Sequence, residues 1–331
     1  MSDMTRRAFV AMSAATFAAA ALPRRATAKV RDDSFFDWIP QRDTAFAAYG
    51  YGGNSLALRG KDGGVLIDCK NAPFGAALRR EAAARVGDLR AVINTHHHAD
   101  HTGGNHAFTT DLPTYAHEKA TPRILGQMNR YIAQAKEAAT QWGDRTGPAI
   151  DQVKREALDF YRGIEKAKAT DFAPRTGVPD SHSLDVAGVK LELRHFGPGH
   201  TDNDLVVYVP SLNILHAGDL LFAGMHPFVD QSAGGNTVGW SAAARKAAEL
   251  CDDRTIVIPG HGEVTTVAAL REQAEYFERV REVVAREMKA GKSRKEIAEM
   301  DHGLYAPYAA PTRRSMTLMA IYDELKAEQA K

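Results

Sequence analysis

The sequence predicts a layered α/β fold, in which sheets are covered by helices. Short apolar runs separated by glycines alternate with segments of helical spacing up to about residue 110. Strand-like runs return between residues 189 and 258, and the chain becomes helical again from about Val267. Because a sheet must bury an apolar face against another layer, this order of elements is typical of sheets packed against helices.

The first elements alternate in short steps. Ser55 to Leu58 and Val65 to Asp68 flank a turn that contains two glycines, and this pattern predicts a β-hairpin. Residues 74–86 carry apolar side chains at helical spacing, and residues 89–94 form a short apolar run typical of a buried strand. Strand and helix therefore follow one another as in an α/β fold.

Residues 113–175 differ in composition, because alanine, lysine, glutamate and glutamine dominate there. Apolar residues recur at three- and four-residue intervals, which predicts two amphipathic helices over about 118–142 and 147–167. A long insertion of this kind either covers a pocket as a lid or uses its apolar stripe for packing, including the packing of a homodimer.

The second half of the chain returns to strands and then to helices. Strands are predicted at residues 189–195, 205–209, 212–216 and 255–258. The helical C-terminal part has a break around residues 305–311. The predicted organisation is a leader over residues 1–28, a catalytic domain over 29–282 and a helical C-terminal extension over 283–331.

Composition narrows the class of protein. The chain has 331 residues, 44% of them hydrophobic and 25% charged, which suffices for a buried core. Its formal net charge of +1 gives no reason to expect nucleic acid as a partner. No stretch after the leader approaches the roughly 20 apolar residues that span a bilayer, so no membrane contact is expected once the leader is removed. Cys69 and Cys251 are expected to be free thiols.

The N-terminus has the features of an export signal. An arginine pair at residues 6–7 precedes Phe9 and an alanine-rich apolar run, and small residues at 26–28 offer a cleavage site. The arginine pair favours the twin-arginine type of signal and hence a periplasmic location. An uncleaved N-terminal helix or anchor is the alternative, because Arg24 and Arg25 lie close to the cleavage site.

The strongest motif is His-x-His-x-Asp-His. It consists of His96, His98, Asp100 and His101. Histidines two residues apart share one side of an extended backbone, so the first two can share an ion. The aspartate and the last histidine follow where the chain must turn, and they can point to a neighbouring position. Imidazole together with carboxylate is a ligand set suited to zinc.

Three further residues of ligand type follow predicted strands. His200, Asp219 and His261 each come after an apolar run, beside a glycine. Ligand sites of open sheets commonly lie beyond the carboxyl ends of strands, and glycine permits a close approach of the backbone. The sequence therefore predicts one shared site at a common edge.

Together these segments resemble the metallo-β-lactamase-fold superfamily over about residues 44–265. The resemblance implies a four-layer αββα sandwich with two zinc ions. It implies that His96, His98 and His200 hold the first ion and that Asp100, His101 and His261 hold the second, with Asp219 between them.

The resemblance further implies a hydrolase of small molecules. Two zinc ions and a shared hydroxide would attack an ester, thioester, lactone or lactam, and Asp100 would orient the nucleophile. Iron-dependent relatives tend to carry glutamate at the position of His98, so this residue favours zinc. An iron-dependent redox enzyme resembling persulfide dioxygenases remains the alternative from another class, and a binding protein without turnover is a third.

Two residues shift the expected substrate. Dedicated class B1 β-lactamases carry cysteine in place of Asp219 and lysine in place of Phe222, so the chain is more similar to glyoxalase-II-like thioesterases and lactonases. A β-lactamase proper is kept as an alternative. His226 lies seven residues after Asp219, and it is a candidate for substrate binding from a loop near the site.

Overall fold

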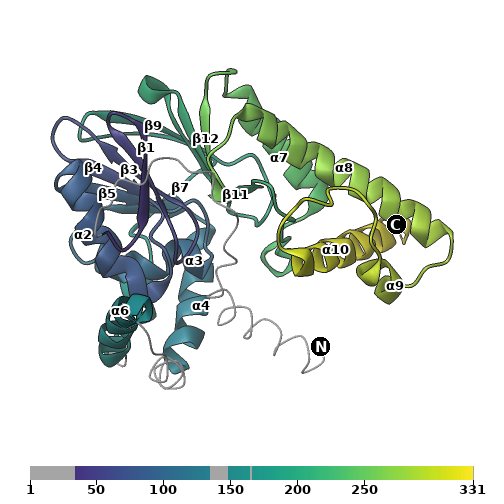
Figure 1. Cartoon of the computed structure of the whole chain (residues 1–331), viewed down its shortest axis with the longest axis horizontal. Helices are drawn as coiled ribbons and strands as arrows, with labels where there is room; N and C mark the ends of the chain where they lie inside the picture. The colour runs from purple at the N-terminus through teal and green to yellow at the C-terminus, as the bar shows by residue number, and fades with distance from the viewer. Residues whose placement is uncertain (1–33, 135–147, 165, 331) are drawn as a thin grey trace.

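A computed structural model describes residues 34–134, 148–164 and 166–330. Two sheets pack face to face, with helices on their outer faces (Figure 1). The predicted signal peptide and residues 135–142 of the first predicted insertion helix lie outside the described residues. Within the described ranges, no helix is long and apolar enough to cross a membrane.

The first sheet has seven strands in chain order. They are β1 (Asp37–Arg42), β2 (Ala45–Tyr49), β3 (Ser55–Arg59), β4 (Gly64–Ile67), β5 (Leu89–Ile93), β6 (Thr114–His117) and β7 (Thr176–Val178). β1 to β4 are antiparallel, and β4 to β7 are parallel. The predicted hairpin is confirmed as β3 and β4, whose register pairs Leu58 with Val65.

The second sheet has five strands in the order β12-β11-β10-β9-β8. They are β8 (Ser181–Val186), β9 (Val189–Arg194), β10 (Val206–Val209), β11 (Ile214–Phe222) and β12 (Ile256–His261). β11 and β12 are parallel, whereas the other pairs are antiparallel.

Side chains alternate between the two faces of each sheet, as the strand period of two requires. Leu56 and Leu58 lie in the core between the sheets, whereas Ala57 between them lies in the core under the first helical layer. In the second sheet, Val207 faces the inter-sheet core and Val206 faces the opposite helices. The two sheets are thus buried on both faces, which requires a four-layer arrangement.

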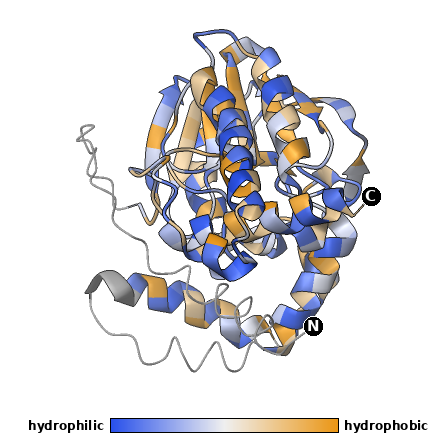
Figure 2. Cartoon of the chain, turned by 90° about the vertical axis from the view of Figure 1, so that its right-hand side faces the viewer, coloured by the Kyte–Doolittle hydropathy of each residue, from blue (hydrophilic) through white to orange (hydrophobic). Residues whose placement is uncertain are grey.

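The outer layers complete an αββα sandwich. The first sheet is covered by α2 (Gly75–Val86), α4 (Ala120–Ala133) and α6 (Pro148–Ile164). The second is covered by α7 (Thr237–Glu249), α8 (Val267–Lys289) and α10 (Pro311–Gln329), with the short α9 (Arg294–Glu299) between the last two. Hydrophobic and hydrophilic residues alternate along these helices (Figure 2), as expected of elements with one buried face. The predicted fold class is confirmed.

Short helical turns connect the main elements. They are η1 (Ala72–Phe74), α3 (Ala99–Thr102), η2 (Gly103–Ala107), η3 (Ala169–Phe172), η4 (Pro210–Leu212) and η5 (Gln231–Ala233).

The insertion is less uniform than the sequence pattern indicates. α4 and α6 match the two predicted helices in the described residues, but the segment begins with strand β6. Thr114 to His117 pair with β5 on one side and β7 on the other, and three of these four residues are buried. A four-residue strand is too short to interrupt the helical pattern of a long alanine-rich window, so the strand that precedes the first helix was not predicted.

The C-terminal helices pack against the second sheet and its loops. The division expected after residue 282 falls within α8, a continuous helix. The predicted break is confirmed, because α10 begins at Pro311. The buried Thr317 hydroxyl of α10 donates to the Pro227 carbonyl at 2.6 Å, and Arg281 of α8 pairs with Glu324 at 2.6 Å.

We predict that Thr317→Val lowers the free energy of unfolding by about 1–3 kcal/mol, because the shape is retained while the Pro227 carbonyl loses its donor. Denaturant unfolding measures this change. Thr312→Val is the matched control, because Thr312 is an exposed threonine of the same helix. Equal stability of the two variants would contradict the role assigned to this contact.

Candidate metal centre

The His-x-His-x-Asp-His motif occupies the connection between β5 and η2. His96 and His97 lie in a bend after β5, His98 is the N-cap residue of α3, and Asp100 and His101 lie in the single turn of α3. The expectation of a turn after His98 is met by this helical turn. The backbone at His96 therefore forms a bend and not an extended strand, contrary to the prediction. The helical turn of α3 brings Asp100 and His101 to the neighbouring position.

The remaining three residues come from the second sheet. His200 lies in the loop after β9, as predicted, whereas Asp219 and His261 lie within β11 and β12 and not in turns beyond them. The pairing of β11 with β12 shifts register on both sides of Gly218, whose φ is +53°. Such an irregularity redirects side chains without ending the strand, and the predicted turns after residues 216 and 258 were therefore wrong.

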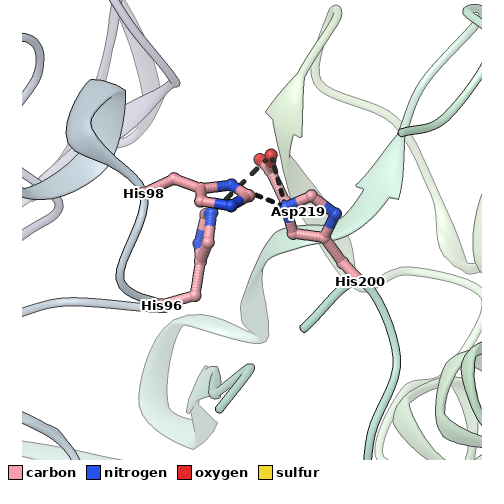
Figure 3. Close-up of side chains that lie close together, drawn as sticks. All are labelled: His96, His98, His200 and Asp219. Carbon is pink, nitrogen blue, oxygen red and sulfur yellow. Dashed lines mark hydrogen bonds and ion pairs between the residues drawn. The ribbon is translucent and has the colours of Figure 1, made fainter. Parts of the chain in front are cut away.

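Four of the seven side chains converge on one point. The group consists of His96, His98, His200 and Asp219 (Figure 3). His98 Nδ1 lies 2.9 Å from His200 Nε2. Asp219 Oδ2 lies 3.4 Å from His200 Nε2 and 3.7 Å from His96 Nε2.

The other three, Asp100, His101 and His261, form a second group beside the first. His261 Nε2 lies 3.1 Å from Asp100 Oδ2. Asp219 also reaches this group, because its Oδ1 lies 3.1 Å from His101 Nε2 and its Oδ2 lies 3.4 Å from His261 Nε2. The Asp219 carboxylate therefore lies between the two groups.

In four histidines, the ring nitrogen that points away from the other ligand atoms, here called the outer nitrogen, faces a hydrogen-bond acceptor. His101 Nδ1 donates to Asp68 Oδ2 at 2.7 Å, and His98 Nε2 donates to Asp230 Oδ2 at 2.9 Å. His200 Nδ1 donates to the Phe228 carbonyl at 2.6 Å. His96 Nδ1 lies 3.1 Å from the Thr95 hydroxyl, which itself donates to Asp68. These acceptors hold the proton on the outer nitrogen, which leaves a lone pair on the inner one.

The inner atoms fit a metal cation. His96 Nε2, His101 Nε2 and Asp219 Oδ1 are buried and make no hydrogen bond. Unpaired buried polar atoms are costly, and three of them aimed into one cluster indicate a missing partner. Tetrahedral zinc ligands at about 2.0–2.1 Å from the ion lie about 3.3 Å apart. Three contacts between ligand atoms of the first group measure 2.9, 3.4 and 3.7 Å.

Charge favours the same assignment. Burial by itself would raise the pKa of Asp219, but His261, His101 and His96 around it hold the pKa well below its usual value. Burial and the neighbouring His101 lower the pKa of His96 well below its usual value. Around the carboxylates the direction is opposite, because Asp230 raises the pKa of His98, and Asp219 and Asp100 raise the pKa values of His101 and His261, in each case against the effect of burial. A metal ion would take the place of these protons, because only ionised carboxylate and neutral imidazole bind a metal.

The cluster opens toward solvent on one side. The side chains of Asp100, His261 and His98 are 25%, 16% and 14% exposed. His96, His101, His200 and Asp219 are at most 3% exposed. A substrate therefore approaches past the first three residues.

Asp68 was not singled out from the sequence, although it directly follows the buried strand β4. Its two oxygens accept hydrogen bonds from the backbone and hydroxyl of Thr95 and from His101. It thereby ties one histidine of each group to β4. Asp230, which holds His98, follows no strand, and only the structure identifies it.

Lys70 is a second residue of the surroundings that the sequence did not reveal. Its side chain is fully buried, and its ammonium donates to the carbonyls of Ala48 and Gly53 at 2.7 and 2.6 Å. Burial lowers its pKa to about 7, against the opposing effect of Asp68 and Asp100. Gly53 in turn lies directly over the His101 ring. The lysine thus fixes the loop that covers the second group.

The other histidines lie outside the cluster. His97 is buried, its Nδ1 lies 3.1 Å from Asn203 Nδ2, and its Nε2 lies 3.8 Å from Asp230 Oδ2, so it contacts the carboxylate that holds His98. His195 and His216 are buried residues of the sheet region, and His195 forms a separate group with His117 and Asp180.

The proposed substrate contact His226 is not brought into the cluster by any contact among the described residues. It is 3% exposed, and its Nδ1 lies 2.8 Å from the Tyr276 hydroxyl of α8. It is therefore not on an exposed loop. Its role toward substrate remains a prediction.

Comparison with known proteins agrees with this geometry. A family model described as the metallo-beta-lactamase superfamily matches residues 48–261. A probable metallo-hydrolase of Bacillus subtilis, YqjP, is 28% identical over 212 residues, which are 60% of this chain and 63% of that protein. The chain thus matches somewhat less than two thirds of the length of this relative.

Solved structures share the fold at low sequence identity. The metallo-beta-lactamase DIM-1 superposes with a TM-score of 0.54 at 19% identity and covers 74% of this chain and 97% of its own. A variant of the sec-alkyl sulfatase PisA1 superposes with a TM-score of 0.63 at 21% identity and covers 87% of this chain and 50% of its own. Proteins named for different substrates therefore share this architecture.

We predict that Gly53→Ala disturbs the second group, because an added Cβ would lie 2.0 Å from the His101 ring. Bound metal measured by mass spectrometry should fall by about one ion per chain at limiting zinc. Gly163→Ala on α6 is the control, since a Cβ there meets nothing within 4 Å. Unchanged metal content in Gly53→Ala would contradict the placement of His101 at an ion.

We predict that Lys70→Met alters how stability depends on pH. Because the pKa of Lys70 is lowered to about 7 in the folded state, the unfolded chain binds more protons above that pH. Stability contributed by this group therefore rises with pH, by at most about 1.4 kcal/mol per pH unit. Urea unfolding of the metal-free protein between about pH 7 and 8.5 should show a steeper rise for wild type than for Lys70→Met. Parallel curves would refute the assignment.

Proposed function

The chain belongs to the metallo-beta-lactamase superfamily, and on this premise we propose that it is a metal-dependent hydrolase that uses two zinc ions. We propose that it cleaves an ester, thioester, lactone or lactam bond of a small molecule. The observation that carries this proposal is the Asp219 carboxylate between two groups of inward-facing ligand atoms.

The donor set supports zinc. Five imidazoles and two carboxylates make up the cluster, and borderline-soft nitrogen donors of this kind suit zinc better than calcium or magnesium. His96, His98 and His200 would hold one ion, and Asp100, His101 and His261 the other. Asp219 contacts both sets and would be shared between them.

When bound, the two ions supply a water that is ionised near neutral pH and a Lewis acid that polarises a carbonyl oxygen. Asp100 lies at the open side with 25% exposure, where its carboxylate can accept a hydrogen bond from the attacking water and orient it. Cys69 is no nucleophile, because it is fully buried and burial raises the pKa of its thiol well above the usual value. In this proposal the chain binds the ions and orients the attacking water, and the reaction needs no covalent intermediate with the protein.

The surroundings of the open side favour a substrate other than a β-lactam. Phe222 stacks on His261 with ring centroids 5.1 Å apart and an interplanar angle of 15°. This buried phenylalanine occupies the position of the lysine grip of class B1 β-lactamases, so β11 supplies no cation there. We propose further that the protein acts in the periplasm after export through the twin-arginine pathway and that it assembles as a homodimer through the insertion.

The alternative from another class is an iron-dependent redox enzyme with the same fold. Metal analysis of protein purified without added metal separates the two. Zinc supports the hydrolase, whereas stoichiometric iron with a visible absorption band supports the redox enzyme.

We predict that chelation abolishes hydrolysis and that zinc restores it, because all reacting groups depend on the bound ions. The assay compares nitrocefin, an acyl-homoserine lactone, S-lactoylglutathione and aryl esters, with turnover expected on a lactone, thioester or ester. His96→Ala should lower activity by at least about 100-fold. His182→Ala, at a histidine outside the cluster, is the control. Activity that survives chelation would rule the proposal out.

A further inference from the structure

Hydrogen bonds connect the C-terminal segment to residues 224–227, which follow the strand that carries Asp219. The backbone N–H groups of Ala309 and His226 donate to the carbonyls of Gly224 and Ala309, both at 3.0 Å. Thr317 of α10 donates to the Pro227 carbonyl at 2.6 Å. The segment gripped in this way leads directly to Phe228, whose carbonyl holds His200. The first turn of α10 is therefore fixed relative to the ligands.

Arg313 in this first turn is connected to the open side through a ring. Its guanidinium carbon lies 5.1 Å from the centroid of the Phe222 ring. That ring stacks on His261, which is one of the three exposed side chains of the cluster. Arg313 and an exposed ligand of the cluster thus contact the same aromatic ring, that of Phe222.

The charge of Arg313 lacks a carboxylate partner among the described residues. Arg294 of α9 and Arg314 of α10 pair with Asp323 and Asp301, at 2.7 and 3.2 Å. The polar contact of Arg313 is with the sulfur of Met225, at 3.6 Å. A guanidinium has five N–H donors, and this contact uses one of them, so the other donors can bind a further acceptor. A half-buried cation held in place with free donors is suited to binding an anion.

We propose that Arg313 forms an anion-binding subsite and that the substrate carries a carboxylate at some distance from the bond that is cleaved. The planar guanidinium offers two parallel N–H groups, which match the two oxygens of a carboxylate. The guanidinium lies over the Phe222 ring, and this cation–π contact helps to hold it in place. This inference rests on the proposed hydrolase function and narrows the class of substrate.

The C-terminal extension thereby acquires a role in specificity. Phe222 and the ligands belong to the sandwich, whereas Arg313 comes from the helix that follows it. A chain that ended after α8 would keep all seven cluster residues and lose this cation.

The test compares two esters with the same leaving group. One is 4-nitrophenyl butyrate, and the other is the mono-4-nitrophenyl ester of glutaric acid, which carries a free carboxylate. Arg313→Ala should lower kcat/KM for the glutarate ester by about 10- to 100-fold and for the butyrate ester by less than about threefold. Arg313→Lys should retain part of the preference, because it keeps the charge but not the fork. Arg314→Ala is the control, since Arg314 is already paired and should leave the ratio of the two esters unchanged.

A second measurement does not require turnover. Isothermal titration calorimetry of glutarate on zinc-loaded protein should give weaker binding for Arg313→Ala than for wild type, with unchanged zinc content. If Arg313→Ala affects both esters equally and leaves glutarate binding unchanged, the subsite is refuted while the hydrolase function stands. If neither ester is hydrolysed but glutarate binding depends on Arg313, the hydrolase proposal fails and the subsite stands.

Discussion

The structure depends on the position of one buried carboxylate, that of Asp219. It contacts histidines of both groups, and burial of its charge is tolerable only because cationic or metal partners surround it. Close packing of β11 against β12 brings it there. A Cβ at Gly260 would lie 1.9 Å from Asp219 Oδ1, so only glycine permits this approach. The irregular register around Gly218 turns the carboxylate away from the sheet. The parallel pairing of β11 with β12 thus places the Asp219 carboxylate between the two groups of ligands.

The surroundings of the cluster transmit this requirement to both sheets. Asp68 at the end of β4 holds Thr95 and His101, and buried Lys70 fixes the loop above them. Asp230 and the Phe228 carbonyl hold His98 and His200 from the opposite side. The first set of contacts comes from the sheet under α2, and the second from a segment fastened to α10. Because every outer nitrogen named here has a fixed acceptor, the inner nitrogens are held facing the cluster, which is the orientation that a metal site needs.

The sequence alone predicted a layered α/β fold and named all seven residues of the cluster, because the patterns that indicate them are local in the chain. Dense histidines and single ligand-type residues after apolar runs can be read without knowing the fold. Three kinds of feature could not be read. β8 was missed because its residues alternate between exposed and half-buried and form no apolar run. The continuation of β11 through Asp219 depends on pairing with β12, so glycine beside the aspartate suggested a turn. The contacts of Asp230, Lys70 and Arg313 link distant segments, and a single sequence contains no sign of them. His226 shows the converse, because a histidine near a ligand in the chain is buried against α8.

The measurement that tests the central claim most directly is a crystal structure of the zinc-loaded protein with anomalous diffraction recorded on both sides of the zinc absorption edge. The account predicts two zinc peaks per chain, one among His96, His98 and His200 and one among Asp100, His101 and His261. It predicts that the Asp219 carboxylate contacts both. A single peak, or two peaks of which Asp219 contacts only one, would contradict the shared carboxylate on which the proposed chemistry rests.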